Sequence, residues 1–299
     1  MDGLNNYISQ NVDNQIIASI HSVHSILVIF LKRTLFVFKN FKSIKIMNLK
    51  LGKTHLTVVF FVCFVAATTA QDLHFGFQLS PSWSWLSTDN TRINGTGSAL
   101  GLKLGLIAEN RFSEAYSIST GLGFHFNTGG ALRFALPGKL WTSSYENFDI
   151  KPGARDTFAK DSKLRYSISF FEIPIGLKMR TPETGNHVRW FAEPQLTIGF
   201  RTNAKGAISS ANPIPDQEKI PIKGEVAGAM LSWGIGAGGE YIISNNTAIV
   251  VGLYYQNGFT DVTKDGSSTM YDTTVTGGQR VDNAKGVIKS LTLRLGVMF

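Results

Sequence analysis

The feature that most constrains this chain is an alternation of apolar and polar residues with a period of two. It recurs eight times after Gln71, where we find no sustained apolar pattern at helical spacing. The last segment, SLTLRLGVMF, places Leu291, Leu293 and Val297 on one face and polar or small residues on the other. Successive side chains of a β-strand point to opposite faces, so each segment predicts a two-faced strand.

The other seven segments show the same pattern, with one irregularity. They begin near Leu73, Leu100, Tyr116, Tyr166, Trp190, Leu231 and Ile249. In the fourth segment the apolar residues change from even to odd positions between Phe170 and Phe171. A one-residue slip of this kind predicts a β-bulge.

The connections between these segments alternate in length. Short turns are expected at residues 110–114, 181–187 and 244–246, and longer polar links at 87–98, 128–161, 202–225 and 260–284. This predicts an up-and-down antiparallel sheet with short turns at one rim and long loops at the other. Eight strands in residues 71–299 would close into one barrel, although 299 residues would otherwise suit two average domains.

Two kinds of eight-stranded barrel are compatible with alternation alone. A lipocalin-like soluble barrel has an apolar lumen, whereas an outer-membrane barrel has an apolar exterior. The polar face here is mostly Gly and Ser, too poor in charge to coat a soluble protein, and the aromatic residues gather toward the strand ends. We therefore predict an all-β fold, an eight-stranded antiparallel up-and-down transmembrane β-barrel integral to the cell outer membrane, with outer-membrane lipid as its surroundings.

The closing strand carries a further sign of this class. Phe299 ends an alternating strand, as outer-membrane barrels usually do, and this predicts recognition by the barrel-insertion machinery through the C-terminal strand. An interior of eight strands is filled by side chains, so a diffusion pore is not expected.

Nine charged residues fall on the face predicted to line the lumen. Because five are basic and four acidic, we expect them to pair in a salt-bridge network that fixes register and blocks passage. A binding or proton-linked site is the alternative. The nine are Lys103, Glu109, Glu172, Lys178, Arg180, Glu193, Arg201, Glu240 and Arg294.

The front of the chain has the layout of a secretory signal peptide. Residues 47–70 begin at Met47 with two lysines, continue through a short apolar run and end in small residues before a cleavage expected after Ala70. The run is too short to span a bilayer. Residues 1–46 are interpreted as an upstream segment outside the native product, with a long leader or an interfacial helix as alternatives, and residues 71–299 as the barrel.

Charge and cysteine content exclude other classes. The net charge of +8 lies mostly in residues 1–70, while residues 71–299 carry 22 basic and 19 acidic groups, so no nucleic-acid partner is expected. The single cysteine, Cys63, lies in the predicted signal peptide, which leaves no thiol chemistry for the barrel. No cofactor or metal site is predicted.

Several segments resemble the PorT-like family of outer-membrane β-barrels of Bacteroidota. They are FFEIPIGLK (170–178), RWFAEPQLTIG (189–199), GAGGEY (236–241), IVVGLYYQNGFTD (249–261) and the closing strand. The resemblance covers essentially residues 71–299 and implies an outer-membrane location and a barrel fold. It also implies, more weakly, a part in protein secretion of the type IX kind.

No enzymatic constellation stands out. Some small outer-membrane barrels modify lipids with a His positioned beside a Ser, but His74 and His125 fall on lumen faces and His187 in a short turn. A protein partner, or an anionic surface glycolipid, is instead expected at the loops 128–161 and 202–225. The first loop mixes aromatic and basic residues that could form such a surface: Trp141, Tyr145, Phe148, Phe158, Lys139, Lys151, Arg155 and Lys160.

Three functions therefore stand in order. The first is a non-enzymatic PorT-like barrel that assists secretion or binds through its loops. The second is a general structural or adhesive barrel of the OmpX type, and the third is an outer-membrane lipid-modifying enzyme.

Overall fold

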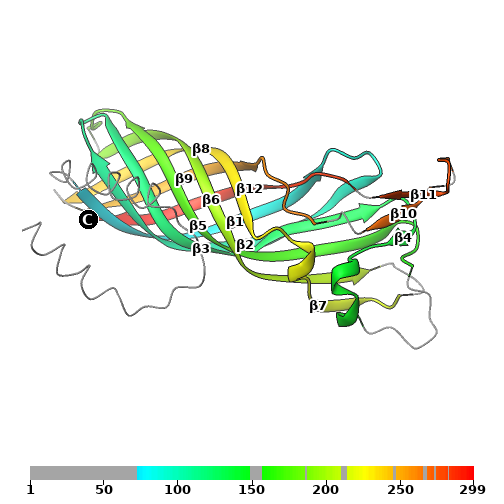
Figure 1. Cartoon of the computed structure of the whole chain (residues 1–299). Coiled ribbons are helices and arrows are strands. Elements are labelled where there is room, and N and C mark those ends of the chain that lie inside the picture. The colour runs from blue at the N-terminus through cyan, green and yellow to red at the C-terminus, as the bar shows by residue number, and fades with distance from the viewer. Residues whose placement is uncertain are drawn as a thin grey trace, which may run out of the picture. The chain divides into compact units, whose positions relative to one another are not determined.

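Eight long strands close on themselves as an antiparallel barrel in the computed structural model of the chain (Figure 1). The structure describes residues 73–148, 157–185, 187–209, 214–244, 247–264, 268–272, 274–281 and 283–299. The predicted upstream segment (1–46) and signal peptide (47–70) lie outside these residues. No helix in the described part is long and apolar enough to cross a membrane.

Each barrel strand pairs with the barrel strands that precede and follow it in the chain. The circle closes where β1 pairs with β12, which confirms the predicted up-and-down barrel. The eight strands are β1 (Leu73–Thr88), β2 (Ile93–Arg111), β3 (Tyr116–Phe134), β5 (Ser162–Arg180), β6 (Val188–Ser209), β8 (Ala229–Ser244), β9 (Thr247–Gly258) and β12 (Gly286–Met298).

Short elements gather at the end of the barrel opposite the C-terminus. A small second sheet has the order β11-β10-β4, and β7 adds to the edge of β6. Two 3₁₀ turns, η3 and η4, lie among them in the chain. The bounds are β4 (Gly138–Lys139), η3 (Thr142–Asn147), β7 (Gln217–Pro221), η4 (Lys223–Glu225), β10 (Thr269–Tyr271) and β11 (Gln279–Val281).

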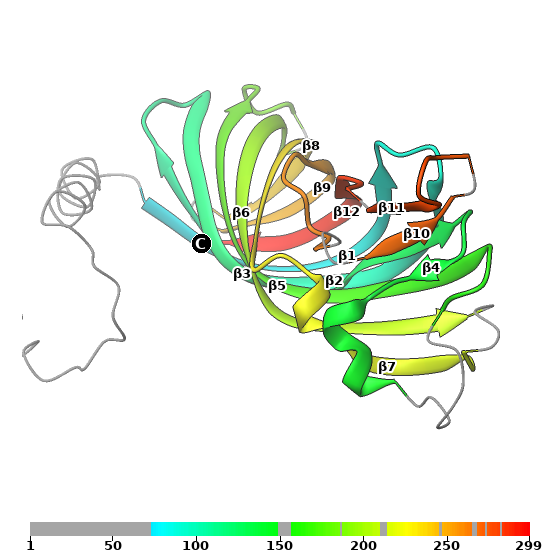
Figure 2. The same cartoon turned by 45° about the vertical axis from the view of Figure 1, so that its right-hand side comes forward.

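Several strands run further than the sequence pattern predicts. The links expected at 128–161 and 202–225 start later, because β3 continues to Phe134 and β6 to Ser209, and the link expected at 87–98 shrinks to residues 89–92. Figure 2 shows β3, β5 and β6 continuing past the barrel toward β4 and β7. We call this part, with residues 128–134, 162–169 and 203–209 as its strands, the extended end.

The predicted slip in β5 is corrected by the structure. Even-numbered residues face inward along all of β5, from Ser162 to Arg180, so the strand itself keeps phase. The irregularities lie in its neighbours: the register shifts between His125 and Thr128 in β3, and Thr202 of β6 is left without a partner on β5. The apolar residues change parity because they point inward in the extended end and outward below it.

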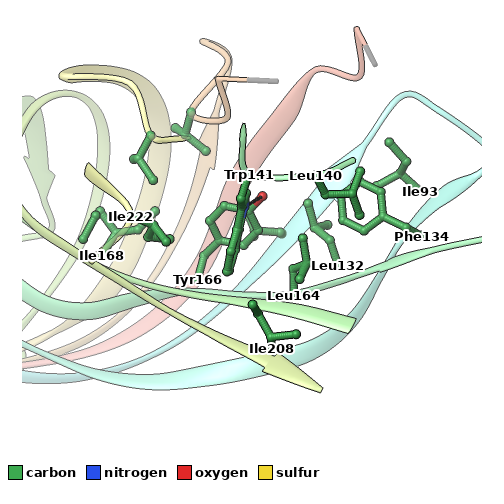
Figure 3. Packing of buried hydrophobic residues seen from close by; sticks show 14 of the residues in the cluster. Ile93, Leu132, Phe134, Leu140, Trp141, Leu164, Tyr166, Ile168, Ile208 and Ile222 are labelled. Carbon is green, nitrogen blue, oxygen red and sulfur yellow. Dashed lines mark hydrogen bonds between the residues drawn. The ribbon is translucent and has the colours of Figure 1, made fainter. Parts of the chain in front are cut away.

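Inward-facing apolar side chains fill the extended end. Phe170, Leu164 and Phe158 are fully buried there, in a cluster that also takes inward residues from β1, β8 and β12. Figure 3 shows Trp141 and Tyr166 at its centre, and the Trp141 indole Nε1–H donates to the Tyr166 hydroxyl over 2.8 Å. Burying a large side chain of this kind contributes roughly 1.5–3 kcal/mol each. The extended end therefore has its own hydrophobic core.

Candidate functional site in the barrel lumen

Below this core the lumen is polar, and its charged side chains form three successive groups. The group closest to the chain termini joins β2, β5 and β8. Lys178 Nζ lies 2.6 Å from Glu109 and also pairs with Glu240. Arg180 pairs with Glu109 as well, and its Nε donates to Glu240 over 2.8 Å. Each cation contacts both carboxylates, so the four groups neutralise one another without water.

The middle group centres on the carboxylate of Glu193 on β6. It accepts hydrogen bonds from the hydroxyls of Ser119 over 2.6 Å and Tyr254 over 2.5 Å, and pairs with Arg294 Nη1 at 3.0 Å. The Arg294 guanidinium also stacks on the Tyr254 ring, 3.7 Å from its centroid. This geometry combines an ion pair with a cation–π contact and joins four strands.

The third group lies beneath the apolar cluster. Lys103 Nζ donates to Glu172 over 2.9 Å and to Gln256 over 2.7 Å. The other oxygen of Glu172 lies 3.1 Å from His125 Nδ1, and His125 Nε2 lies 2.8 Å from the Ser82 hydroxyl. These contacts tie β1, β2, β3, β5 and β9 together across the lumen.

Eight of the nine predicted lumen charges belong to these three groups, and Arg201 does not. Its guanidinium donates to the backbone oxygens of Lys223 and Val226 in the extended end. The register shift at Thr202 is the physical reason, because Arg201 stands where β6 changes the parity of its inward face. Without it the described lumen holds four cations and four anions.

The lumen leaves little free space. A cavity of about 30 Å³ remains between the middle and third groups, lined by Lys103, Glu172, Tyr254 and Arg294 among others. That volume suits one or two water molecules. Among the described residues no group of three or more His, Cys, Asp or Glu side chains is placed to hold a metal ion.

Ser82, His125 and Glu172 stand in the order of a hydrolase triad. Ser82 is fully buried, however, and the His125 ring is 2% exposed, so a substrate cannot reach the hydroxyl. The interaction therefore acts as a cross-strand hydrogen-bond chain. Of the other histidines, His187 lies in its turn with Nδ1 2.9 Å from Glu183.

Charge alone did not reveal the neutral members of the network. Ser119, Tyr254 and Gln256 bond directly to the charged groups, and they occupy inward positions of their strands. Tyr254 was predicted on the polar face, so its position was available, but its partners depend on how the strands close.

The outer wall of the barrel is apolar and bears two aromatic bands. Near the termini it exposes Phe75, Phe77, Phe112, Tyr116, Trp190, Tyr241 and Phe299. Toward the extended end it carries Trp83, Phe124, Phe126, Phe171, Phe200 and Trp233. Leucines, isoleucines and valines fill the wall between them. An exposed apolar belt of this extent fits lipid and not water.

On β5, eight residues separate Phe171 from Met179. At about 3.3 Å per residue and a tilt near 40° they rise about 20 Å, close to the apolar height of an outer-membrane barrel. An apolar wall, aromatic bands and a polar, filled lumen define an integral membrane β-barrel.

Comparison with known families gives the same class. The family described as outer membrane protein beta-barrel domain matches residues 69–264, and the chain belongs to it. The protein is thus an integral outer-membrane barrel.

The chain is also similar in fold to solved outer-membrane proteins. Neisserial surface protein A is 14% identical, with 75% of this chain and 95% of that chain covered and a TM-score of 0.35. Ail, the attachment invasion locus protein of Yersinia pestis, is 11% identical, with coverage of 77% and 100% and a TM-score of 0.30. The outer membrane protease OmpT from Escherichia coli is 8% identical, with coverage of 77% and 97% and a TM-score of 0.33. A search of the curated proteins finds no match.

The aromatic residues of loop 128–161 do not form the binding surface expected from the sequence. Trp141 is 3% exposed and Phe158 is 0% exposed, both inside the apolar cluster, and Phe148 packs against it. They are buried because β4 and η3 fold back over the inward face of the extended strands. Lys151 and Arg155 lie outside the described residues.

Proposed function

We propose that this protein is a non-enzymatic, non-conducting outer-membrane barrel that acts through its extended end at the cell surface. The observation that carries the proposal is the continuation of β3, β5 and β6 beyond the membrane wall around a hydrophobic core of their own. In outer-membrane barrels the short turns face the periplasm and the long loops face outward. The extended end is then a rigid extracellular platform on a closed barrel.

The kind of action follows from what the barrel leaves available. The lumen groups bind one another, so the lumen offers no path, and Ser82 is enclosed. A platform suits contact with another macromolecule. Assistance to protein secretion, as in the PorT-like proteins that the strand motifs resemble, is the first candidate, and a structural or adhesive role of the OmpX type is the second.

The test is a deletion strain of the native host, complemented with three alleles. The first is the wild type, and the second replaces residues 268–281, which include β10 and β11, with a short Gly-Ser linker. The third, a matched control, replaces the turn 181–185 at the opposite rim. Each allele is first checked for heat-modifiable gel mobility, which reports a folded barrel.

The proposal expects the wild type and the turn variant to restore the missing function and the 268–281 variant to fail although it folds. Loss of exported surface proteins identifies the secretion role. Detergent sensitivity with normal export identifies the structural role. An altered lipid A mass in the deletion strain, restored by all three alleles, would instead establish the enzyme and overturn the proposal.

A further inference from the structure

The outward face of the extended end carries a row of basic side chains across three adjacent strands. Arg133 lies on β3, Lys163 and Arg165 on β5, and Lys205 on β6, and all four are exposed. We call these four residues the basic row. It shares no residue with the loop surface considered from the sequence.

The register brings these side chains together. Arg133 lies directly opposite Lys163, and Arg165 follows Lys163 on the same face. Lys205 lies opposite Ser167, one position diagonal from Arg165. Directly opposed side chains have Cβ atoms about 4.5–5.5 Å apart, and diagonal neighbours lie about 7–8 Å apart. The four cations therefore occupy one continuous patch.

Little on these strands neutralises the row. Between residues 128–134, 162–169 and 203–209 of the described structure no acidic side chain faces outward. The nearest one, Asp161 before β5, has its Oδ1 3.9 Å from Arg133 Nη1 and is half exposed. Like charges directly opposite each other destabilise a sheet. An arrangement of this kind is stabilised by an anion that spans several of the cations.

The height of the row above the membrane identifies that anion. On β5, Phe171 belongs to the upper aromatic band, Ser167 and Ser169 follow, and Arg165 lies six residues further on. Six residues at about 3.3 Å and a tilt near 40° place Arg165 about 15 Å above the ring. That is the level of the sugar head groups of a glycolipid in the outer leaflet, and not of its acyl chains.

The geometry points to the basic row as a binding surface for the phosphate groups of outer-leaflet glycolipid, with the upper aromatic band against the acyl chains. Guanidinium and ammonium groups both bind phosphate, and Arg does so bidentately. The inference rests on the outer-membrane location and on this surface, and is independent of the secretion role.

The test compares two variants of the full-length chain folded in detergent micelles. The row variant carries Arg133→Gln, Lys163→Gln, Arg165→Gln and Lys205→Gln. The control variant removes the same charge elsewhere in the extended end, with Lys219→Gln, Lys223→Gln, Lys264→Gln and Lys285→Gln, all exposed in the structure. Binding to purified lipopolysaccharide, to enzymatically dephosphorylated lipopolysaccharide and to inorganic phosphate is measured at 150 mM salt.

We expect the row variant to lose affinity for lipopolysaccharide by about tenfold or more and the control variant by less than about threefold, since surface pairs are individually weak but act here together. Dephosphorylation should reduce wild-type binding to the level of the row variant. Heat-modifiable mobility confirms that both variants fold.

Three results would overturn the inference. Equal losses in the two variants would mean that net charge alone attracts the lipid. Full competition by millimolar inorganic phosphate would assign the row to a free anion. Unchanged lipopolysaccharide binding by a folded row variant would leave the surface to an acidic protein instead.

Discussion

At the residue scale, Glu193 has the most demanding position in the molecule. Its carboxylate is buried beside Arg294, Ser119 and Tyr254 in the middle of the lumen. We expect Glu193→Ala to lower the free energy of unfolding by about 3–5 kcal/mol, because it leaves the Arg294 charge buried without a partner. Urea unfolding in micelles, followed by tryptophan fluorescence, measures the change.

Ser119→Ala is the matched control for Glu193→Ala. It removes one hydrogen bond to the same carboxylate and keeps the ion pair, so we expect a loss of about 1–2 kcal/mol. If both variants lose the same free energy, the ion pair contributes nothing beyond its hydrogen bonds.

Glu225, in the extended end, gives a prediction of pH dependence. Burial raises the pKa of its carboxyl above 4.5, and the hydroxyl and amide of Ser144 and the amide of Ser143 offset this only partly. Neither carboxylate oxygen has a hydrogen-bond partner of normal geometry, which agrees with a raised value. In the window from pH 4.5 up to the folded-state pKa, the folded chain holds a proton that the unfolded chain has released.

Stability should therefore fall as pH rises through that window. Glu225→Gln stays neutral, so the variant should gain stability relative to the wild type at pH 7.5 and little at pH 4. Paired urea titrations at the two pH values measure this. A variant whose relative stability is the same at both would show that Glu225 does not titrate between the two states.

At the element scale, the register shift in β3 depends on backbone conformations that few residues adopt. Gly129 has φ +135°, and a Cβ there would lie 2.3 Å from the carbonyl oxygen of Tyr166 on β5. We expect Gly129→Ala to destabilise the barrel by about 1–3 kcal/mol. Gly185→Ala, in a turn with open space around the added methyl group, is the control and should change stability by less than about 0.5 kcal/mol. Equal effects in the same unfolding assay would contradict a special role for the shift.

The strands also show what the sequence could and could not predict. Alternation predicted all eight strands and which face is outward, because lipid and a polar lumen impose opposite preferences on neighbouring positions. It did not predict the extended end. Beyond Phe170 the strands leave the membrane, the apolar side is the inner one, and the same period reads as a slip in β5.

The site has a parallel limit. The inward positions of Lys178, Glu240 and Arg294 follow from strand parity alone, so most of the lumen network was predictable. Arg201 was misplaced because an extra residue in β6 changes which side chains face inward. The burial of Trp141 depends on a loop folding back onto the strands, and no local pattern encodes that.

At the scale of the whole molecule, four obstructions lie in series along the barrel axis. Three are the charged groups around Lys178, Glu193 and Glu172, and the fourth is the apolar cluster around Phe170. Each is built from strands on several sides of the barrel. An ion entering from either end would have to displace paired charges and then cross an apolar layer.

We therefore expect the purified protein to give no stepwise conductance in planar lipid bilayers, and expect Arg294→Ala to remain silent too. That substitution loosens only the middle group, and the group of Glu109, Lys178, Arg180 and Glu240 still fills the lumen below it. A porin inserted in the same bilayers is the positive control. Regular steps from the wild type would mean that the lumen groups separate in a membrane, whereas steps from Arg294→Ala alone would make the middle group the single barrier.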